Sequence, residues 1–187
     1  MLEKYKKYKE RYFKNLEGRV VELGAGYGVN AEYHSRQSRI LLVEPETEKH
    51  GKLNISFSKR GMAPNITWST LEDLKFPDNS IDVIMDSLVL CSVVDPQKTL
   101  AEIHRVLKSG GRYVFLEHIA GATGGTLYWW QNSLNSIWKW ATGGCHCTRS
   151  LDKAIRQTGF SEVDMEYFTS HKVFPLMRRH IVGVVIK

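Results

Sequence analysis

Apolar residues follow two alternating patterns along this chain. Short runs rich in Val, Ile and Leu alternate with longer segments in which apolar residues fall three or four positions apart. The first pattern is typical of buried strands and the second of amphipathic helices, so their alternation predicts an α/β fold with a largely parallel sheet. The expected strands cover residues 20–23, 39–44, 65–69, 81–86, 112–117, 160–168 and 180–187. The expected helices cover residues 2–16, 30–37, 46–60, 95–108 and 148–158.

The first expected strand runs directly into a glycine-rich turn. Gly24, Gly26 and Gly28 stand at alternate positions, where glycine accepts a positive φ and lets a ligand approach the backbone. The helix expected after them would direct free N–H groups at that ligand. This pattern predicts a nucleotide-type cofactor at the carboxyl end of the first strand. An ordinary tight strand–helix turn is the alternative.

The spacing of these glycines separates several cofactor classes. A dinucleotide fingerprint, G-x-G-x-x-G, needs a third glycine where Val29 stands, and no Lys-Ser/Thr pair follows to make a phosphate loop. Glu44 ends the second strand about 20 residues after Gly24, a distance at which such folds return a carboxylate to a ribose. A carboxylate merely exposed to solvent is the alternative. The dinucleotide interpretation stays open here because that cofactor also contains ribose.

Three stretches in the order of the chain resemble class I S-adenosylmethionine-dependent methyltransferases. They are E-x-G-x-G-x-G from Glu22, "LEDLKFPDNSIDVIMDSLVL" at 71–90 and "EIHRVLKSGGRYVFLEH" at 102–118. The resemblance implies a Rossmann-like, mostly parallel seven-stranded sheet with an antiparallel last strand, and S-adenosylmethionine as cofactor. It implies binding through Glu22, Gly24, Gly26, Gly28, Glu44, Pro45, Thr70, Leu71, Glu72, Ser87 and Leu88. Thr70 stands where the family often has an adenine-binding Asp, so Glu72 or a backbone carbonyl is expected to replace it.

Four shorter stretches narrow the resemblance. "SLVLCSV", "LEH", the insertion "LYWWQNSLNSIWKWATGGCHCTR" and the terminal "RRHIVGVVIK" look like the small-molecule thiol S-methyltransferases of the methyltransferase-like seven group. This resemblance covers roughly residues 8–187 and implies a thiol as methyl acceptor. Those proteins carry a hydrophobic amino-terminal anchor that this sequence does not show, so membrane association would rest on its basic first helix.

Residues 119–147 form an aromatic insertion after the fifth strand. An insertion there lies at the carboxyl edge of the sheet, above the expected cofactor, where aromatic side chains make an apolar acceptor pocket. A hydrophobic cap packed on the sheet is the alternative. We expect a substrate lid formed by Tyr128, Trp129, Trp130 and Trp138.

The chemistry of the acceptor follows from the cofactor. A thiol of pKa near 8.5 is already partly ionised at neutral pH, so a strong protein base is not required. Candidates for deprotonating or orienting the acceptor are Asp86, Glu117, His118 and His146, although His118 is equally consistent with a hydrogen-bonded core histidine. The alternatives are ubiquinone-type, phospholipid-headgroup and arsenite methyltransferases, the last through the three cysteines, and a non-catalytic domain that binds cofactor and a protein partner.

Composition adds limits to this picture. The 187 residues, 42% hydrophobic and 25% charged, fit a single globular domain over 1–187. No apolar run has the length of a membrane span or signal peptide. Three cysteines favour free thiols in a reducing, cytoplasmic compartment. The triplet at 145–147 is too short for a zinc site, so no metal is expected.

The net charge of +6 is concentrated at the start of the chain. Residues 1–19 carry seven basic and three acidic side chains, and the rest has no basic stripe, so nucleic-acid binding is not expected. Residues 1–16 have aromatic residues on one face and lysines opposite. The expected helix either packs on the domain and helps close the cofactor site, or also contacts an anionic membrane. A small-molecule acceptor is the expected partner, and the chain is expected to be a monomer.

Overall fold

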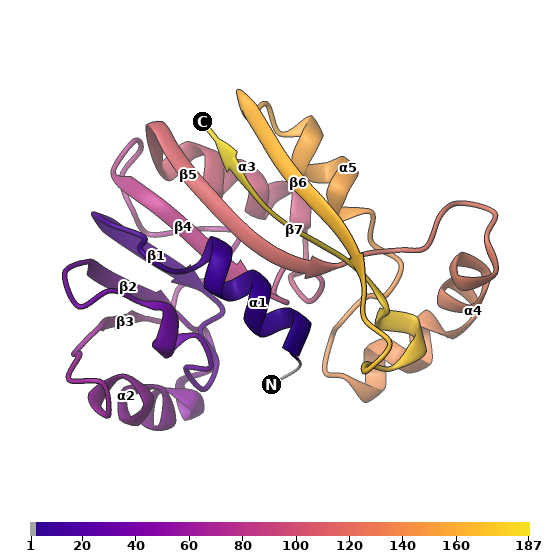
Figure 1. The fold of residues 1–187 in the computed structure, drawn as a ribbon, viewed down its shortest axis with the longest axis horizontal. Helices are drawn as coiled ribbons and strands as arrows, with labels where there is room; N and C mark the ends of the chain where they lie inside the picture. The colour runs from indigo at the N-terminus through magenta and orange to yellow at the C-terminus, as the bar shows by residue number, and fades with distance from the viewer. Residues whose placement is uncertain (1–2) are drawn as a thin grey trace.

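The computed structural model describes residues 3–187, so Leu2 of the expected first helix lies outside the described residues. One seven-stranded sheet has the order β3-β2-β1-β4-β5-β7-β6 (Figure 1). Its strands are β1 Arg19–Leu23, β2 Arg39–Val43, β3 Asn65–Thr67, β4 Ile81–Ser87, β5 Leu107–His118, β6 Glu162–Thr169 and β7 Arg179–Ile186. Strands β1 to β5 are parallel, and β7 runs antiparallel to both β5 and β6. The predicted parallel sheet with an antiparallel last strand is confirmed.

Helices cover both faces of the sheet. They are α1 Glu3–Tyr12, α2 His50–Ser58, α3 Pro96–Val106, α4 Thr126–Ala141 and α5 Leu151–Gln157. On one face, Leu100 and Ile103 of α3 and Ile155 of α5 pack with the sheet in the largest buried cluster. On the other face, Tyr5 of α1 and Phe13 belong to a second buried cluster. α4 lies at one end of the molecule, beside the β6–β7 connection (Figure 1).

The first helix is shorter than the predicted 2–16 and packs on the domain. It ends at Tyr12, and Asn15 adopts a φ of 59° as the chain turns toward β1. Tyr5 donates or accepts a 2.5 Å hydrogen bond with Nε2 of His180, and Tyr8 stacks on Phe168 at 4.5 Å between ring centroids. The aromatic face of α1 is therefore turned toward the sheet and not toward solvent.

Three other predicted helices differ from the structure. In place of a helix over 30–37, a 3-10 turn covers Ala31–Tyr33, because Asn30 and His34 are both held by the buried Glu22 carboxylate. The helix expected over 46–60 contains a 3-10 turn at Thr47–Lys49 followed by α2. The last predicted helix begins at Leu151 after Ser150, and not directly after Thr148.

The fifth strand begins earlier than expected because it contains an irregularity. Ile81 pairs with Leu107 and Val83 with Arg112, so the intervening Gly110–Gly111 segment bulges out of the ladder. α3 matches its predicted start: the Asp95 side chain accepts from the N–H groups of Gln97 and Lys98, as an N-cap residue does. Among residues 3–187, no helix combines the length and apolarity needed to cross a bilayer.

Candidate active site

The glycine turn after β1 uses its three glycines for two different purposes. All three have positive φ, 58° at Gly24, 56° at Gly26 and 78° at Gly28. A Cβ at Gly24 would lie 2.7 Å from the Val89 side chain, and one at Gly28 would lie 2.7 Å from Ser56. A Cβ at Gly26 would meet only the Gly24 carbonyl oxygen, at 3.8 Å. Packing therefore requires glycine at Gly24 and Gly28. At Gly26 the space that a Cβ would occupy is open, so a ligand can approach the backbone there.

Glu44 holds this turn from the end of β2. Its side chain is buried; Oε2 accepts from the Gly26 N–H at 2.7 Å and Oε1 accepts from the Glu46 N–H at 3.0 Å. His50 Nε2 contacts the Glu44 carbonyl oxygen at 2.8 Å. The carboxylate is thereby fixed beside the open side of Gly26, and the ribose contact expected of it stays a prediction.

A cavity of about 400 Å³ opens at the carboxyl ends of β1, β2 and β4, the edge where open α/β sheets bind ligands. Gly24, Gly26 and Glu44 line it, and so do other predicted cofactor residues: Pro45, Thr70, Leu71, Glu72 and Leu88. Glu22, Gly28 and Ser87 are not among its lining residues. The lining residues that sequence reasoning did not name include Lys49, Ser92, Thr142 and Gly143.

Glu22 acts on the far side of the turn. Its buried carboxylate accepts from Asn30 Nδ2 at 2.8 Å and contacts His34 Nε2 at 2.6 Å. Lys9 of α1 donates to the Asn30 side-chain oxygen at 2.7 Å. Burial lowers the pKa of Lys9 to about 8, although the Glu22 charge opposes this. Glu22 therefore fixes the segment after the glycine turn and links it to α1.

Glu72 connects the two loops that flank the cavity. Its Oε1 accepts from the Val94 N–H at 2.8 Å and from the Asp95 N–H at 3.3 Å. This carboxylate is therefore already used by the protein backbone, and the adenine contact assigned to it stays a prediction. Thr70 lines the same cavity and is exposed.

Two predicted catalytic carboxyl groups are buried beneath the cavity. Asp86 of β4 accepts from the Tyr113 hydroxyl at 2.5 Å. Glu117 of β5 accepts from the N–H groups of Val89 and Leu90 at 2.5 and 2.8 Å. Burial raises the pKa of Glu117 to about 7, although the two N–H donors favour the charged form and so oppose the shift. Burial, together with the Glu117 charge, raises the pKa of Asp86 well above its usual range. The pair therefore holds a proton near neutral pH and supports the loop after β4.

His118 lies in a cluster that sequence reasoning missed. Its Nε2 lies 3.0 Å from the Cys145 Sγ. The sulfur atoms of Cys91 and Cys145 and a ring nitrogen of His118 all lie within 4.8 Å of one another. A hydrogen bond from Cys91 lowers the pKa of Cys145 to about 4, with a smaller contribution from His118, while burial opposes the shift. The three residues come from separate segments, so their spacing carries no signal in the sequence.

His146 stands apart from this cluster. Its Nδ1 lies 3.4 Å from Asn135 Nδ2, and its backbone N–H donates to the Cys91 carbonyl oxygen at 2.8 Å. Burial lowers the pKa of the ring, and the charges of Arg149 and Lys139 lower it further. The backbone of His146 thus joins the segment after α4 to the loop after β4.

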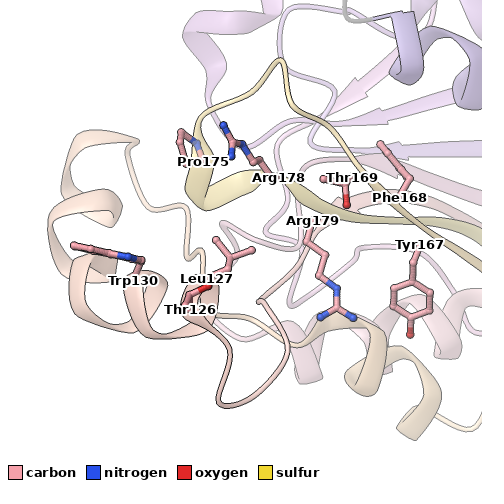
Figure 2. A pocket seen from close by; sticks show the side chains of 9 residues that line it. All are labelled: Thr126, Leu127, Trp130, Tyr167, Phe168, Thr169, Pro175, Arg178 and Arg179. Atoms are coloured by element: carbon pink, nitrogen blue, oxygen red, sulfur yellow. The ribbon is translucent and has the colours of Figure 1, made fainter.

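The predicted lid tryptophans do not line the cofactor cavity. Trp129 and Trp130 on α4 are 60% and 52% exposed, and Tyr128 beside them is half-buried. Trp138 contacts a buried side chain, since its indole N–H donates to Cys145 Sγ at 3.4 Å, and its ring stacks on the exposed Phe174 at 5.0 Å between ring centroids. Figure 2 shows Trp130 at a separate hollow near the β6–β7 connection, lined also by Leu127 and Arg178. The insertion reaches the cofactor cavity through Thr142 and Gly143, and the aromatic lid stays a prediction.

The sheet order, the glycine turn and the carboxylate at the end of β2 together define a class I methyltransferase site. The sequence model of the family described as "Methyltransferase domain" matches residues 21–115. The fold is shared with the YcgJ protein of Bacillus subtilis, with a TM-score of 0.76 at 17% identity over 95% of this chain and 94% of that chain. A geranyl diphosphate C-methyltransferase of Streptomyces coelicolor, solved with S-adenosyl-L-homocysteine, gives a TM-score of 0.71 at 13% identity, covering 98% and 78%.

Two curated relatives extend over most of the chain. Thiol S-methyltransferase TMT1B of Rattus norvegicus is 33% identical over 90% of this chain and 70% of its own length. Thiol S-methyltransferase TMT1A of Homo sapiens is 30% identical over the same shares. This chain belongs to the S-adenosylmethionine-dependent methyltransferase family that contains these proteins. Its cofactor is S-adenosylmethionine, which the open side of Gly26 and the fixed carboxylate of Glu44 can accommodate.

Proposed function

We propose that this chain transfers the methyl group of S-adenosylmethionine to a small apolar thiol. S-Adenosylmethionine supplies an electrophilic methyl group on a sulfonium. The observation that carries the thiol assignment is the similarity to TMT1A and TMT1B, which extends over 90% of this chain and therefore beyond the cofactor motifs into the insertion at 119–147. Relatives named for other acceptors cover less of the chain, such as the phosphatidylethanolamine N-methyltransferase of Cereibacter sphaeroides at 55%.

The residues at the site support this assignment chemically. We propose that Gly26 and Glu44 bind the cofactor and that Ser92 and Gly143, across the same cavity, face the acceptor. The buried carboxyl groups of Asp86 and Glu117 do not line this cavity, so neither is in place to abstract a proton from a bound acceptor. A thiol needs no such base, because part of it is thiolate at neutral pH. An amine or phenol would depend on one more strongly.

The test is a series of thiols of different pKa. Initial rates should rise with pH until the thiol is ionised, and the inflection should shift when the thiol is changed. An inflection that stays constant across the series would place the titrating group on the protein, and His118→Gln and His146→Gln would then identify it. Absence of turnover with every thiol, beside turnover of a phenol or lipid headgroup, would overturn the thiol assignment and leave the fold unaffected.

The positions of the cysteines do not favour an arsenite methyltransferase. Only Cys91 and Cys145 come together, whereas the Cys147 sulfur lies 3.6 Å from the Gln131 carbonyl oxygen and 3.5 Å from Asn135 Oδ1. Three thiolates around one arsenic are therefore not assembled by the described residues.

A contact with an anionic membrane would use only part of the first helix. Tyr5 and Tyr8 are packed against the domain, which leaves the exposed lysines, among them Lys4 and Lys7. Such a contact would be electrostatic, about 1 kcal/mol for each lysine near the surface and screened by salt. Flotation with anionic and neutral vesicles at two ionic strengths tests this contact. Equal binding to anionic and neutral vesicles would contradict it. The monomeric state, the single domain and the cytoplasmic location stay predictions.

A further inference from the structure

Three buried side chains with soft or borderline ligand atoms converge below the cofactor cavity. They are Cys91 from the loop after β4, His118 at the end of β5 and Cys145 after α4; each is at least nine-tenths buried. Their ligand atoms all lie within 4.8 Å of one another. In a tetrahedral zinc site, two sulfur ligands lie about 3.8 Å apart, and a sulfur and a nitrogen about 3.6 Å. The 3.0 Å contact between His118 Nε2 and Cys145 Sγ would need to open only slightly to admit the ion.

The loops that carry the two cysteines are held together by backbone contacts. The His146 N–H donates to the Cys91 carbonyl oxygen at 2.8 Å. The Arg149 guanidinium donates to the carbonyl oxygens of Leu90 and Val93 at 2.5 and 2.6 Å. These bonds keep both sulfurs in position without a covalent link between them, which is the pre-organisation that a metal site requires.

Each sulfur also has an outer hydrogen-bond partner. The Trp138 indole N–H donates to Cys145 Sγ at 3.4 Å, and the Ser92 hydroxyl lies 3.5 Å from Cys91 Sγ. Outer-shell donors of this kind orient thiolate ligands and tune the metal that they bind. His118 Nε2 faces Cys145 Sγ, whereas its Nδ1 is buried and has no hydrogen-bond partner among residues 3–187; this nitrogen lacks the outer acceptor that a metal-ligating histidine usually has.

We propose that Cys91, His118 and Cys145 bind a zinc ion, and that the fourth coordination position of this ion takes the acceptor thiol as thiolate. Two thiolates and one imidazole with an open position form a known type of catalytic zinc site. Cys91 adjoins Ser92, and Cys145 follows shortly after Gly143, both of which line the cofactor cavity. None of the three ligands lines that cavity itself, so the proposal requires the acceptor sulfur to pass between Ser92 and Gly143 to reach the open position.

This inference rests on the proposed function, because it specifies how the acceptor is held. On binding, the acceptor S–H bond breaks, a metal–sulfur bond forms and the proton passes to solvent. The methylated sulfur of the product is a neutral thioether, which is a weaker ligand than a thiolate and leaves the ion. No oxidant or reductant takes part.

Metal binding by the whole chain tests the proposal. Cobalt(II) reports on thiolate ligands through charge-transfer absorption, and zinc competes it out. Wild type should bind one cobalt ion with this absorption, and its ligand-field bands should shift when a small thiol is added. Cys91→Ser and Cys145→Ser should each weaken binding at least about 100-fold, since even outer-shell changes cost 10–100-fold. Cys147→Ser is the matched control, because that buried cysteine lies outside the cluster; it should bind like wild type.

The outcomes separate this inference from the proposed function. Absence of thiolate–cobalt absorption in folded wild type, or equal absorption in Cys145→Ser, would overturn the metal site. Binding without a spectral shift on adding thiol would overturn the acceptor role. Thiol methylation that persists undiminished in metal-free protein would overturn the inference while leaving the proposed function in place. Metal and thiol binding without any methylation would support the site and contradict the proposed function. If a serine variant fails to fold, the cobalt titrations of wild type and of His118→Gln still test whether the cluster binds a metal.

Discussion

The side of the cavity that we assign to the cofactor and the side that we assign to the acceptor are built in different ways. The cofactor side consists of the turn after β1 and the end of β2, where Gly26 and Glu44 meet through one hydrogen bond between residues close in sequence. The acceptor side joins the loop after β4 to the segment after α4, where His146 contacts Cys91 across a long stretch of chain. Local chemistry specifies the first side, and tertiary packing specifies the second.

This difference determines how substitutions on each side affect binding and stability. On the cofactor side, one glycine with an open flank and one buried carboxylate carry the site. On the acceptor side, the buried Asp86–Glu117 pair, the cysteine cluster and Trp138 support one another. We therefore expect substitutions on the cofactor side to change cofactor binding more than stability, and those on the acceptor side to change stability and acceptor use together.

The largest effect is expected from Gly26→Val. Its φ of 56° is costly for a branched residue, and its side chain would project into the cavity. Cofactor affinity measured by calorimetry should fall below detection. Gly110→Val is the matched control: it has a φ of 73°, equally open space and a place outside the cavity. Both variants should lose about 1–2 kcal/mol of stability, but Gly110→Val should bind the cofactor normally. Equal loss of binding in both would contradict the role of Gly26.

Glu44→Ala should weaken cofactor binding by about 1–3 kcal/mol, because the N–H groups of Gly26 and Glu46 and the ribose hydroxyls would lose their acceptor. Glu44→Gln retains one acceptor oxygen and should give an intermediate loss. Calorimetry on the three proteins provides the comparison. If Glu44→Ala binds S-adenosylmethionine like wild type, the ribose assignment is wrong.

Glu117→Gln should change how stability depends on pH. Because burial raises the pKa of Glu117 to about 7, the folded protein retains a proton that the unfolded chain releases above its usual pKa of 4.5. Stability of wild type should therefore fall, by about 1–3 kcal/mol, as pH rises from 5 to 8. In urea titrations the variant should have a smaller slope than wild type and retain the part due to Asp86, whose pKa burial also raises. A parallel slope in both proteins would show that Glu117 is not the group responsible.

The smallest effects concern the tryptophans of α4. Trp138→Ala should cost about 1–2 kcal/mol of stability, because it removes the stack on Phe174 and a donor to Cys145. Trp140, which is 85% exposed, is the control, and Trp140→Ala should change stability by less than about 0.5 kcal/mol. Trp138→Ala should also raise the acceptor KM more than Trp129→Ala. A larger increase of KM in Trp129→Ala would instead support the predicted role of Trp129 in the lid.

The sequence allowed prediction of the features that depend on neighbouring residues. The alternation of strands and helices, the glycine turn, Glu44 and the Asp95 cap were all predictable because each depends on local geometry. The helix over 30–37 was wrong because Glu22, on a strand, captures Asn30 and His34. The cysteine–histidine cluster was missed because its members meet only after the sheet has formed. The run of tryptophans in the sequence indicated an aromatic insertion. It did not indicate which of these side chains packs against the domain.

A direct test of the central claim is a competition among acceptors for one labelled methyl group. The protein is incubated with methyl-labelled S-adenosylmethionine and an equimolar mixture of a small thiol, a phenol, an amine and arsenite, with phosphatidylethanolamine vesicles in a parallel sample. Mass spectrometry then locates the label. We predict that it appears on the thiol sulfur as a thioether, and that Gly26→Val abolishes the product while Gly110→Val does not. Label on any other acceptor, with none on the thiol, would contradict the account.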